Sequence, residues 1–412
     1  MKKKILIIGN GANAYALAKR LSYDNDVYVA PGSDTIKEFA TCLDIREDSV
    51  NELLDFVLEN DIDLTIPISQ KALSVDICKK FADNKQNIFG PTYNACEVLS
   101  NKTLAKKMLY KLRIPTPKFG IFEKSNVAID YLKNQTIPFV IKNNDSNSAA
   151  VITSILSAKK IIESAFQGKN KRIIIEDYVY GTPFSFYSIT DGYKALPIGS
   201  SIIYKHSLSG EGGQLTSGMG ACVPNYKLSL KDEYYIMDNI IYPTIEYLEK
   251  NGTPYLGILG VNGIYTQEGK IQILGWQTFT QDSDTDGILN LLDEDLISLM
   301  QSCIIGSFSD EVNEINLRSG YSVSLVLHSN KNDNKENVIK GICNDSDRIL
   351  TAFYPNVKKN RYFEYEAQKG PNIVLTSYAS CISKASEYVY RDAKDIEFDG
   401  MFYRNDICKT EL

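Results

Sequence analysis

Short apolar runs alternate with helical patterns over the first hundred residues. None of these runs is long enough for a helix. The first, Ile5 to Ile8, is continuously apolar, as in a strand buried on both faces of a parallel sheet. The runs lie at 5–8, 27–30, 64–66 and 87–90. Amphipathic helical patterns separate the first three. Strands that alternate with helices predict a doubly wound α/β domain over residues 1–100.

The pattern changes after Asn101, where strand signals follow one another with few helices between them. A helix is predicted at 102–112, and a hairpin is predicted where Thr190-Asp191-Gly192 separates two apolar runs. Further strands are predicted at 139–142, 172–176, 257–265 and 271–274. Residues 210–220 contain five glycines, which predicts a mobile loop or a close approach of backbone to a ligand. This part of the chain is therefore predicted to be α+β.

The last hundred residues repeat strand signals at 322–327 and 372–376 and then a helix at 382–390. They could form a small separate domain.

Composition and charge restrict the class of protein. Hydrophobic residues make up 43% and charged residues 23%, and the net charge is -6 with both signs mixed along the chain. This argues against a nucleic-acid-binding protein, which needs a basic face. The eight cysteines form no closely spaced pair, so neither a zinc ribbon nor a redox dithiol is indicated. No apolar stretch has the length of a membrane span. We therefore expect a cytoplasmic protein with no membrane partner.

Several polar residues stand where a site could form, and each has a plain structural alternative. Gly9-Asn10-Gly11 lies between a strand and a helix and could hold a phosphate, or could simply be a tight turn. Lys142 ends one apolar strand and Glu176-Asp177 end the next. The lysine could bind phosphate oxygens and a carboxylate could bind adenine or ribose. The alternative is a snorkelling lysine and a solvated strand end.

The histidines and one acidic loop are less specific. His206 stands beside Lys205 just before the glycine-rich stretch, while His328 has no evident partner and is predicted to be structural. Asp282, Asp284 and Asp286 could bind Mg²⁺. A solvated acidic turn before a helix is an equal alternative.

Taken together, these stretches resemble the phosphoribosylamine–glycine ligase family (glycinamide ribonucleotide synthetase). The segments that carry the resemblance run in order through the chain: GNGANAYALA at 9–18, VAPGS at 29–33, IDLTI at 62–66, IFGPT at 88–92, SNKTLAKKML at 100–109, RIPTP at 113–117, IPFVIK at 137–142, RIIIEDYVYGTPFSF at 172–186, TDG at 190–192, SGMGA at 217–221, YLGILGVNGIY at 255–265 and FDGMFYRNDI at 398–407.

The resemblance implies a three-part ATP-grasp architecture. Its parts would be an N-terminal α/β domain at 1–100, an ATP-grasp domain at 101–315 with a mobile lid at about 118–190, and a C-terminal domain at 316–412. It also implies a reaction in which the carboxylate of glycine takes the γ-phosphoryl group of ATP. The amine of phosphoribosylamine would then attack the acyl phosphate. Mg²⁺ and lysine side chains would neutralise phosphate charge in such chemistry.

Site residues can be carried over only where this sequence matches the family. For ATP, the resemblance implies Lys102, Lys142, Glu176, Asp177 and Val179. For the other substrates, it implies Gly9, Gly11, Pro31, Gly32, Lys205, Gly218 and Gly220. The metal candidates are Gln277, Asp282 and Asp284. No catalytic residue is assigned, although Lys205 and His206 are candidates.

The sequence also departs from the family in its expected site. The segment EFNxRFGDPE of the family is Gly275 to Asp284 here, so glycine replaces the carboxylate ligand, Gln277 replaces an amide ligand, and Phe279 replaces the phosphate-binding arginine. The glycine-rich loop of the family, at 147–151, lacks its lysine. Because Mg²⁺ between phosphates prefers anionic oxygens, catalysis is predicted to be impaired or altered.

Two hypotheses therefore remain open from the sequence. One is a ligase with weak or altered activity on glycine and phosphoribosylamine, acting as a monomer or small homo-oligomer. The other is a non-catalytic ATP-grasp homologue that serves as a nucleotide-binding or scaffold protein.

Overall fold

The computed structural model describes residues 2–143, 149–167, 172–331, 337–342 and 349–409. The chain divides into two compact units. The larger contains residues 1–96, 185–260 and 278–412, and the smaller contains residues 97–184 and 261–277.

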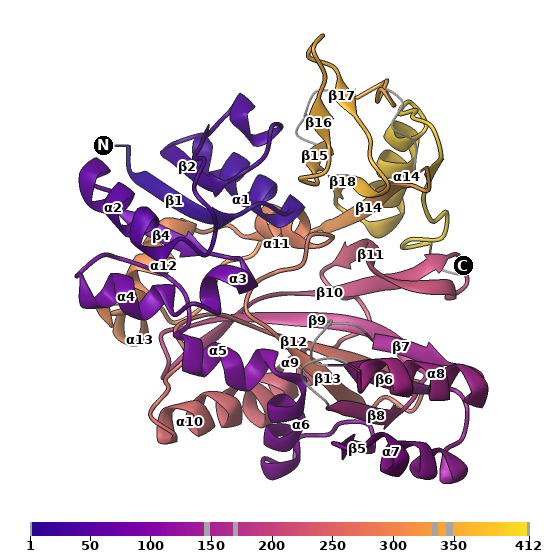
Figure 1. Ribbon diagram of the computed structural model, residues 1–412. Coiled ribbons are helices and arrows are strands. Elements are labelled where there is room, and N and C mark those ends of the chain that lie inside the picture. Colours follow the sequence, from indigo (N-terminus) through magenta and orange to yellow (C-terminus); the bar gives the residue numbers. More distant parts are fainter. Residues whose placement is uncertain (1, 144–148, 168–171, 332–336, 343–348, 410–412) are drawn as a thin grey trace. The chain divides into compact units, whose positions relative to one another are not determined.

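A parallel sheet opens the larger unit, as the sequence predicts. Its strand order is β3-β2-β1-β4. The central strand, β1, pairs in parallel with β2 on one side and β4 on the other. Four successive isoleucine and leucine side chains of β1 are fully buried, because the sheet is covered on both faces. Figure 1 shows these strands in indigo. The bounds are β1 Lys4–Gly9, β2 Asp26–Pro31, β3 Thr41–Cys42 and β4 Leu64–Pro67.

Helices cover this sheet, and they begin where the amphipathic patterns indicate. α1 buries most of its alanine-rich surface, while α2 buries one face through Leu53, Leu54 and Val57. The strand predicted at 87–90 is wrong, since only Ile88 makes an isolated parallel bridge, to Thr65 of β4. The bounds are α1 Ala12–Ser22, the 3₁₀ turn η1 Ile36–Glu38, α2 Val50–Asn60, α3 Gln70–Leu73, α4 Ile77–Asp83 and α5 Tyr93–Ser100.

A second, antiparallel sheet forms the rest of the larger unit. Its strands follow the order β12-β9-β10-β11-β14-β18-β15, with β19 paired to β14. β9 and β12 continue into the smaller unit. The predicted hairpin around Thr190–Gly192 joins β9 to β10. The bounds are β9 Gly181–Thr190, β10 Ala195–Leu208, β11 Gly212–Val223, β12 Gly257–Thr266, β14 Tyr321–Ser329, β15 Ile349–Phe353, β18 Gly370–Ala379 and β19 Met401–Phe402.

The sequence predicts either a mobile loop or a close approach of backbone to a ligand for the glycine-rich stretch at 210–220, and the structure shows a strand instead of a loop. The stretch forms the turn and most of β11, which pairs with β10 and with β14. Glycine is needed there for packing, because a Cβ at Gly220 would lie 2.4 Å from the carbonyl oxygen of Ser324 in β14. The close approach here is between two strands rather than between backbone and a ligand, and it selects glycine for the same reason.

The remaining helices of the larger unit pack on this antiparallel sheet. α14 lies against β14 and β18, as Figure 1 shows, and α11 also contacts β14. A short two-stranded ribbon consists of β16 Lys358–Lys359 and β17 Tyr365–Glu366. The helices are α9 Leu230–Ile236, the π-helical turn η3 Met237–Ile241, α10 Tyr242–Lys250, α11 Thr285–Leu291, α12 Leu296–Ile305, α13 Phe308–Glu311 and α14 Ile382–Ala393.

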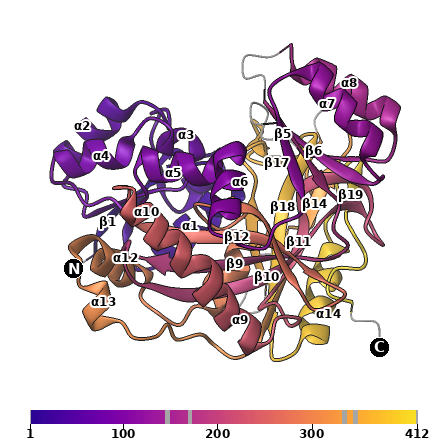
Figure 2. The ribbon, with the colours of Figure 1, turned by 90° about the horizontal axis from the view of Figure 1, so that it is seen from below.

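The smaller unit has its own antiparallel sheet, of order β5-β8-β6-β7, and its own core. α7 and α8 lie together in Figure 2 and bury Ala128, Ala158 and Ile162. β13 is the hydrogen-bonded neighbour of β12, at the end of the large antiparallel sheet. The bounds are α6 Lys102–Lys111, β5 Phe119–Phe122, α7 Ser125–Tyr131, the 3₁₀ turn η2 Leu132–Asn134, β6 Phe139–Asn143, β7 Ala149–Ile152, α8 Ile155–Ala165, β8 Ile173–Asp177 and β13 Ile271–Gln277. The fold class predicted from sequence is confirmed.

None of the helices in the described part of the chain is both long and apolar enough to cross a lipid bilayer.

Candidate functional site

Glu176 is a buried carboxylate held between two lysines in the smaller unit. Its Oε1 lies 2.5 Å from Nζ of Lys142, and its Oε2 lies 2.7 Å from Nζ of Lys106. Glu176 and Lys106 are each 2% exposed and Lys142 is 11% exposed. Burial alone would raise the pKa of Glu176, but the two ammonium groups outweigh burial and lower it. The carboxylate is therefore ionised at neutral pH.

The register of the sheet explains how Lys142 and Glu176 meet. β6 and β8 are antiparallel, and Val140 pairs with Glu176 while Lys142 pairs with Ile174. Lys142 and Glu176 are thus diagonal neighbours on one face of the sheet. The sequence predicts both residues at strand ends that would line a cleft. In fact, the ends of the two strands point in opposite directions, and it is the shared face that brings these side chains together.

Lys106 is the member of this cluster that is not predicted from the sequence. It lies one helical turn after Lys102 on α6, so both lysines share a helix face. Lys106 also donates a hydrogen bond of 2.6 Å to the hydroxyl of Thr116. Burial lowers the pKa of Lys106 to about 8 although Glu176 acts against this change. The spacing of four residues between Lys102 and Lys106 is the one sign in the sequence that both face the same way. A lysine in an amphipathic helix is normally solvated, so this sign does not predict burial.

Lys102 brings a third ammonium group towards the same sheet. Its Nζ donates a hydrogen bond of 3.0 Å to the carbonyl oxygen of Asn143 at the end of β6. Burial, followed by repulsion from Lys142, lowers the pKa of Lys102 to about 8. The N-terminus of α6 is capped by Asn101, whose side chain accepts hydrogen bonds from the amides of Thr103 and Leu104. Lys102, Lys106 and Lys142 thus surround one carboxylate, a local excess of positive charge that suits a polyphosphate.

Asp177 and Val179 take other positions around this sheet. The side chain of Asp177 is exposed, points away from the Glu176 face and accepts a hydrogen bond of 2.9 Å from Gln135. Val179 follows β8 and is half-buried. The structure therefore brings together Lys102, Lys142 and Glu176 from the predicted nucleotide residues, but not the side chain of Asp177.

The N-terminus of α1, in the larger unit, already has an anionic partner. Oδ1 of Asp282 accepts a hydrogen bond of 2.9 Å from the backbone amide of Asn13. A Cβ at Gly11 would lie 2.7 Å from the same oxygen, which is why the N-cap position is glycine. Burial raises the pKa of Asp282, while the amides of Asn13 and Ala12 lower it. The sequence leaves open whether this turn holds a phosphate or is a plain tight turn, and in the structure its Asn13 amide donates to a carboxylate of the chain.

Pro31 and Gly32 form a tight turn at the end of β2. Gly32 has φ of +70°, and a Cβ there would lie 2.4 Å from Sγ of Cys42. Glycine is thus required by the backbone. Gly9, at the end of β1, also has no room for a side chain, since a Cβ there would lie 2.7 Å from the side chain of Ile68. Their predicted role in substrate binding remains a prediction.

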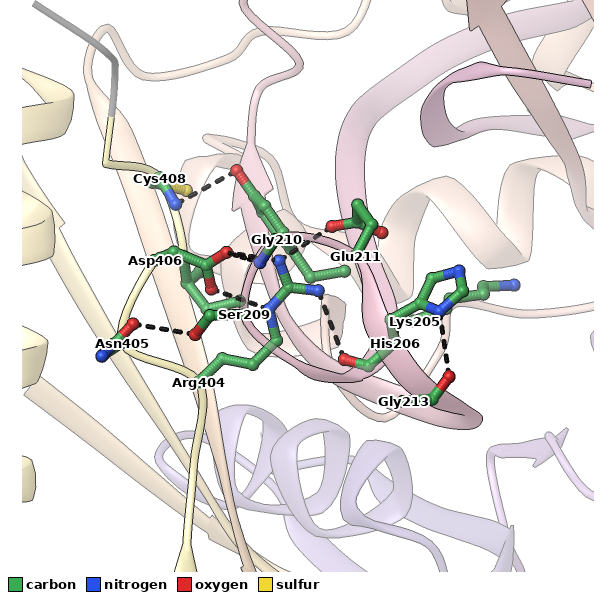
Figure 3. Close-up of polar contacts among 12 residues, drawn as sticks. Lys205, His206, Ser209, Gly210, Glu211, Gly213, Arg404, Asn405, Asp406 and Cys408 are labelled. Carbon is green, nitrogen blue, oxygen red and sulfur yellow. Dashed lines mark hydrogen bonds and ion pairs between the residues drawn. The ribbon is translucent and has the colours of Figure 1, made fainter.

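Lys205 and His206 lie on β10, close to its hairpin turn with β11. Nδ1 of His206 is 3.4 Å from the carbonyl oxygen of Gly213. The backbone of Lys205 accepts a hydrogen bond of 2.9 Å from the hydroxyl of Thr216. A Cβ at Gly218 would lie 2.7 Å from Oγ of Ser283. Figure 3 shows the side chains of Lys205 and His206 directed away from Arg404.

Asp284, a metal candidate, is fully buried in the larger unit and has three hydrogen-bond donors. It accepts hydrogen bonds of 2.8 Å from the hydroxyl of Tyr187 and 2.7 Å from that of Ser201. The backbone amide of Gln281 donates a third, of 2.9 Å. Burial raises the pKa of Asp284 to about 6 against these donors and the charge of Lys205. Its oxygens anchor the loop before α11.

Among the predicted Mg²⁺ ligands, the carboxylates of Asp282 and Asp284 already accept hydrogen bonds from the chain, and Gln277 supplies no anionic oxygen. Gln277 is neutral, and its Nε2 donates a hydrogen bond of 3.1 Å to Oδ1 of Asn262. Gly275 has no side chain, although a Cβ there would meet nothing within 4 Å. Among the described residues, no group of three or more His, Cys, Asp or Glu side chains could hold a metal ion. The donors present in the described residues therefore do not fit Mg²⁺. That ligands of the family are substituted in this chain stays a prediction.

Phe279 stands where the family pattern has an arginine, and its ring belongs to the main hydrophobic core of the larger unit. It is 8% exposed. The missing lysine of the glycine-rich loop was assigned to residues 147–151, of which 147 and 148 lie outside the described residues.

Comparisons with known proteins give a consistent result over almost the whole chain. Residues 3–98 match the family model described as phosphoribosylglycinamide synthetase, N domain, and residues 100–285 match the model of its ATP-grasp (A) domain. A phosphoribosylamine–glycine ligase of Clostridium acetobutylicum is 28% identical over 99% of this chain and 100% of its own length. One of Caldanaerobacter subterraneus is 26% identical over 98% of this chain and 99% of its own length.

Solved structures agree on the fold. The crystal structure of phosphoribosylamine–glycine ligase from Thermotoga maritima has a TM-score of 0.80 at 20% identity, and covers 98% of this chain and 100% of its own. The biotin carboxylase domain of a 2-oxoglutarate carboxylase from Hydrogenobacter thermophilus has a TM-score of 0.74 at 14% identity, and covers 98% of this chain and 92% of its own. The comparisons favour the ligase hypothesis over the non-catalytic homologue.

Proposed function

Because the chain belongs to the phosphoribosylamine–glycine ligase family, we propose that it joins glycine to phosphoribosylamine at the expense of ATP, in purine biosynthesis in the cytoplasm. The observation that carries this proposal is the group of three lysines around Glu176. Nucleotide phosphates need such a concentration of fixed positive charge, and buried ammonium groups act more strongly than solvated ones because the local dielectric constant is low.

Each residue of the cluster has a distinct part in nucleotide binding. Lys102 and Lys142 neutralise the negative charge of the polyphosphate. Glu176 fixes the direction of the Lys142 side chain, and Lys106 balances the second oxygen of Glu176. Lys106 is thus a positioning residue that acts through the carboxylate.

The reaction balances as two substitutions. An oxygen of the glycine carboxylate attacks the γ-phosphorus of ATP, the bond to the β-phosphate oxygen breaks, and ADP leaves. The amine of phosphoribosylamine then attacks the carbonyl carbon of glycyl phosphate. A C–N bond forms, the C–O bond to phosphate breaks, and the amine loses a proton. Lys205 and His206, on the β10–β11 hairpin, are the candidates for contacts with the substrates.

The residues at the substituted positions are the reason why we propose a slow reaction. Gly275 and Gln277 offer no carboxylate for a metal ion, and Phe279 offers no cation for the phosphate of phosphoribosylamine. Removal of a single charge-stabilising group typically costs about 2.7–4 kcal/mol of transition-state stabilisation. We therefore propose a turnover well below that of relatives with the full set of ligands.

The test is an assay of ADP release with ATP, glycine and freshly prepared phosphoribosylamine, with each substrate omitted in turn. We expect slow ADP release that requires ATP, glycine and phosphoribosylamine together. Thermal melting with ATP supplies a second measurement, in which Lys142→Ala should abolish the nucleotide-induced rise in melting temperature. Lys133→Ala, a surface lysine paired with Asp130, is the matched control. ADP release at the same rate without glycine would refute the proposal. So would a nucleotide-induced rise in melting temperature that is unchanged in Lys142→Ala.

A further inference from the structure

Arg404 is a buried cation that the proposed reaction does not use. Its side chain is 1% exposed. Nε and Nη2 contact the two oxygens of Asp406 at 2.8 and 2.7 Å, and Nη2 also lies 2.8 Å from Oε1 of Glu211. Nη1 donates a hydrogen bond of 3.2 Å to the carbonyl oxygen of His206. The guanidinium carbon lies 5.0 Å from the ring centre of Tyr204, and Figure 3 shows these contacts together.

The part of the hairpin that Arg404 contacts is irregular. Tyr204 pairs with Gly220, but His206 pairs with Leu215. Lys205, the residue between Tyr204 and His206, therefore lies opposite the longer segment 216–219 of β11. A second register shift follows before Leu208. Bulges redirect side chains but leave backbone groups outside the regular ladder. The shape of the hairpin at Lys205 therefore depends on side-chain contacts.

Glu211, at the turn of the hairpin, has a backbone conformation that depends on these contacts. Its φ is +57°, a left-handed conformation that favours glycine and costs a residue with a Cβ some energy. Such a conformation persists only where the surroundings fix it. The ion pair with Arg404 does so, and Oδ2 of Asp406 accepts a hydrogen bond of 2.9 Å from the adjacent amide of Gly210.

The segment that carries Arg404 is itself held in place. Oγ of Ser209, at the hairpin turn, donates a hydrogen bond of 2.8 Å to Asn405, and the amide of Cys408 donates one of 3.1 Å to the hydroxyl of Tyr204. The hydroxyl of Tyr390 in α14 donates to the carbonyl oxygen of Arg404. The hairpin is thus tied to α14 through residues 404–408.

We propose that Arg404 is a positioning residue, which fixes the β10–β11 hairpin in the shape that presents Lys205 and His206 to the substrates. This inference rests on the proposed function. Arg404 contributes no group to the reaction. It acts through the carbonyl oxygen of His206 and the carboxylate of Glu211, from the side opposite to the two presented side chains. Its planar, forked guanidinium satisfies these acceptors and both oxygens of Asp406 together, which lysine cannot do.

The chain contains two histidines, and His206 lies on β10 of the hairpin, so its side-chain carbon–proton NMR signal reports on the shape of the hairpin. In Arg404→Lys, the His206 signal should shift or broaden. Hydrogen exchange of amides 205–217 should become at least about tenfold faster in the same variant. Arg391→Lys is the matched control, because Arg391 is 59% exposed and pairs with its neighbour Asp392.

A second variant distinguishes loss of the Arg404 contacts from unfolding of the protein. Glu211→Asn keeps a residue that tolerates positive φ, removes the carboxylate and leaves the pair of Arg404 with Asp406 intact. It should reproduce the change in the His206 signal and in exchange. In turnover, both variants should lower kcat about tenfold or more and leave the KM for ATP unchanged, because both substitutions weaken the hairpin and leave the lysine cluster intact.

Unchanged His206 signals and hairpin exchange in both variants would overturn the proposal, as would kcat equal to that of the unmodified protein. If the unmodified protein has no ligase turnover, the proposed function fails. In that case, the NMR and exchange measurements still decide whether Arg404 fixes the hairpin.

Discussion

The carboxylate of Asp282 accepts a hydrogen bond from the backbone amide of Asn13, in the first turn of α1. The two residues are far apart in sequence, and the contact places a negative charge at the positive end of the helix dipole. It also joins the loop before α11 to the first βα turn of the chain. A protein carboxylate thus accepts a hydrogen bond from the turn that the sequence interprets either as a phosphate site or as a plain tight turn.

Asp282→Ala should destabilise the larger unit by about 1–2 kcal/mol, because the N-terminal amides of α1 lose their acceptor. Urea unfolding followed by circular dichroism measures this loss. Asp34→Ala removes the same charge from an exposed pair with Lys37 and serves as the control. Equal stability of the two variants would show that the hydrogen bond does not stabilise the helix.

Lys106→Met should destabilise the protein by about 3–5 kcal/mol, the usual loss when a buried ion pair is left with one partner. Glu176→Gln should cost less in the Lys106→Met background than in the unmodified protein, because the oxygen that pairs with Lys106 has already lost its partner. A double-mutant cycle in urea measures the coupling. Additive effects of the two substitutions would contradict direct pairing.

The sequence predicts the parallel sheet and several strands of the antiparallel sheets, because periodicity and strand length follow from burial of apolar side chains. Its resemblance to the ligase family indicates part of the lysine cluster. It identifies Lys102, Lys142 and Glu176, but not Lys106, since solvated and buried lysines look alike in an amphipathic helix. It also misses Arg404, whose partners Glu211 and His206 become neighbours only when the chain folds. Single-sequence patterns do not specify such long-range pairs.

His328 should make stability depend on pH below neutrality. Burial lowers its pKa from 6.5 to about 4, so the unfolded chain binds a proton that the folded protein does not. The associated stability is present above pH 6.5 and is lost as pH falls towards 4, by about 3 kcal/mol. His328→Gln should remove this part of the pH dependence in unfolding experiments between pH 7 and 4. Parallel curves for the two proteins would contradict the assignment.

Gly275→Glu combined with Gln277→Asn should raise turnover, because it restores the acidic and amide ligands where a Cβ at Gly275 meets open space. Phe279→Arg would complete the family pattern, but it places a charge in the core and should destabilise the protein by several kcal/mol. ADP release with Mg²⁺ and melting temperature should therefore be measured for the double and the triple variant. A double variant with no gain would indicate that the metal positions do not limit the rate.

The central claim, that the protein is a slow ligase of glycine and phosphoribosylamine, is tested most directly by detecting the product. Isotope-labelled glycine, ATP and freshly prepared phosphoribosylamine should be incubated with the protein, beside the Clostridium acetobutylicum relative, and labelled glycinamide ribonucleotide should be measured by mass spectrometry. We predict product that requires ATP and forms well below the rate of the relative. Absence of labelled product would contradict the ligase function, and a rate equal to that of the relative would contradict the account of its substituted site.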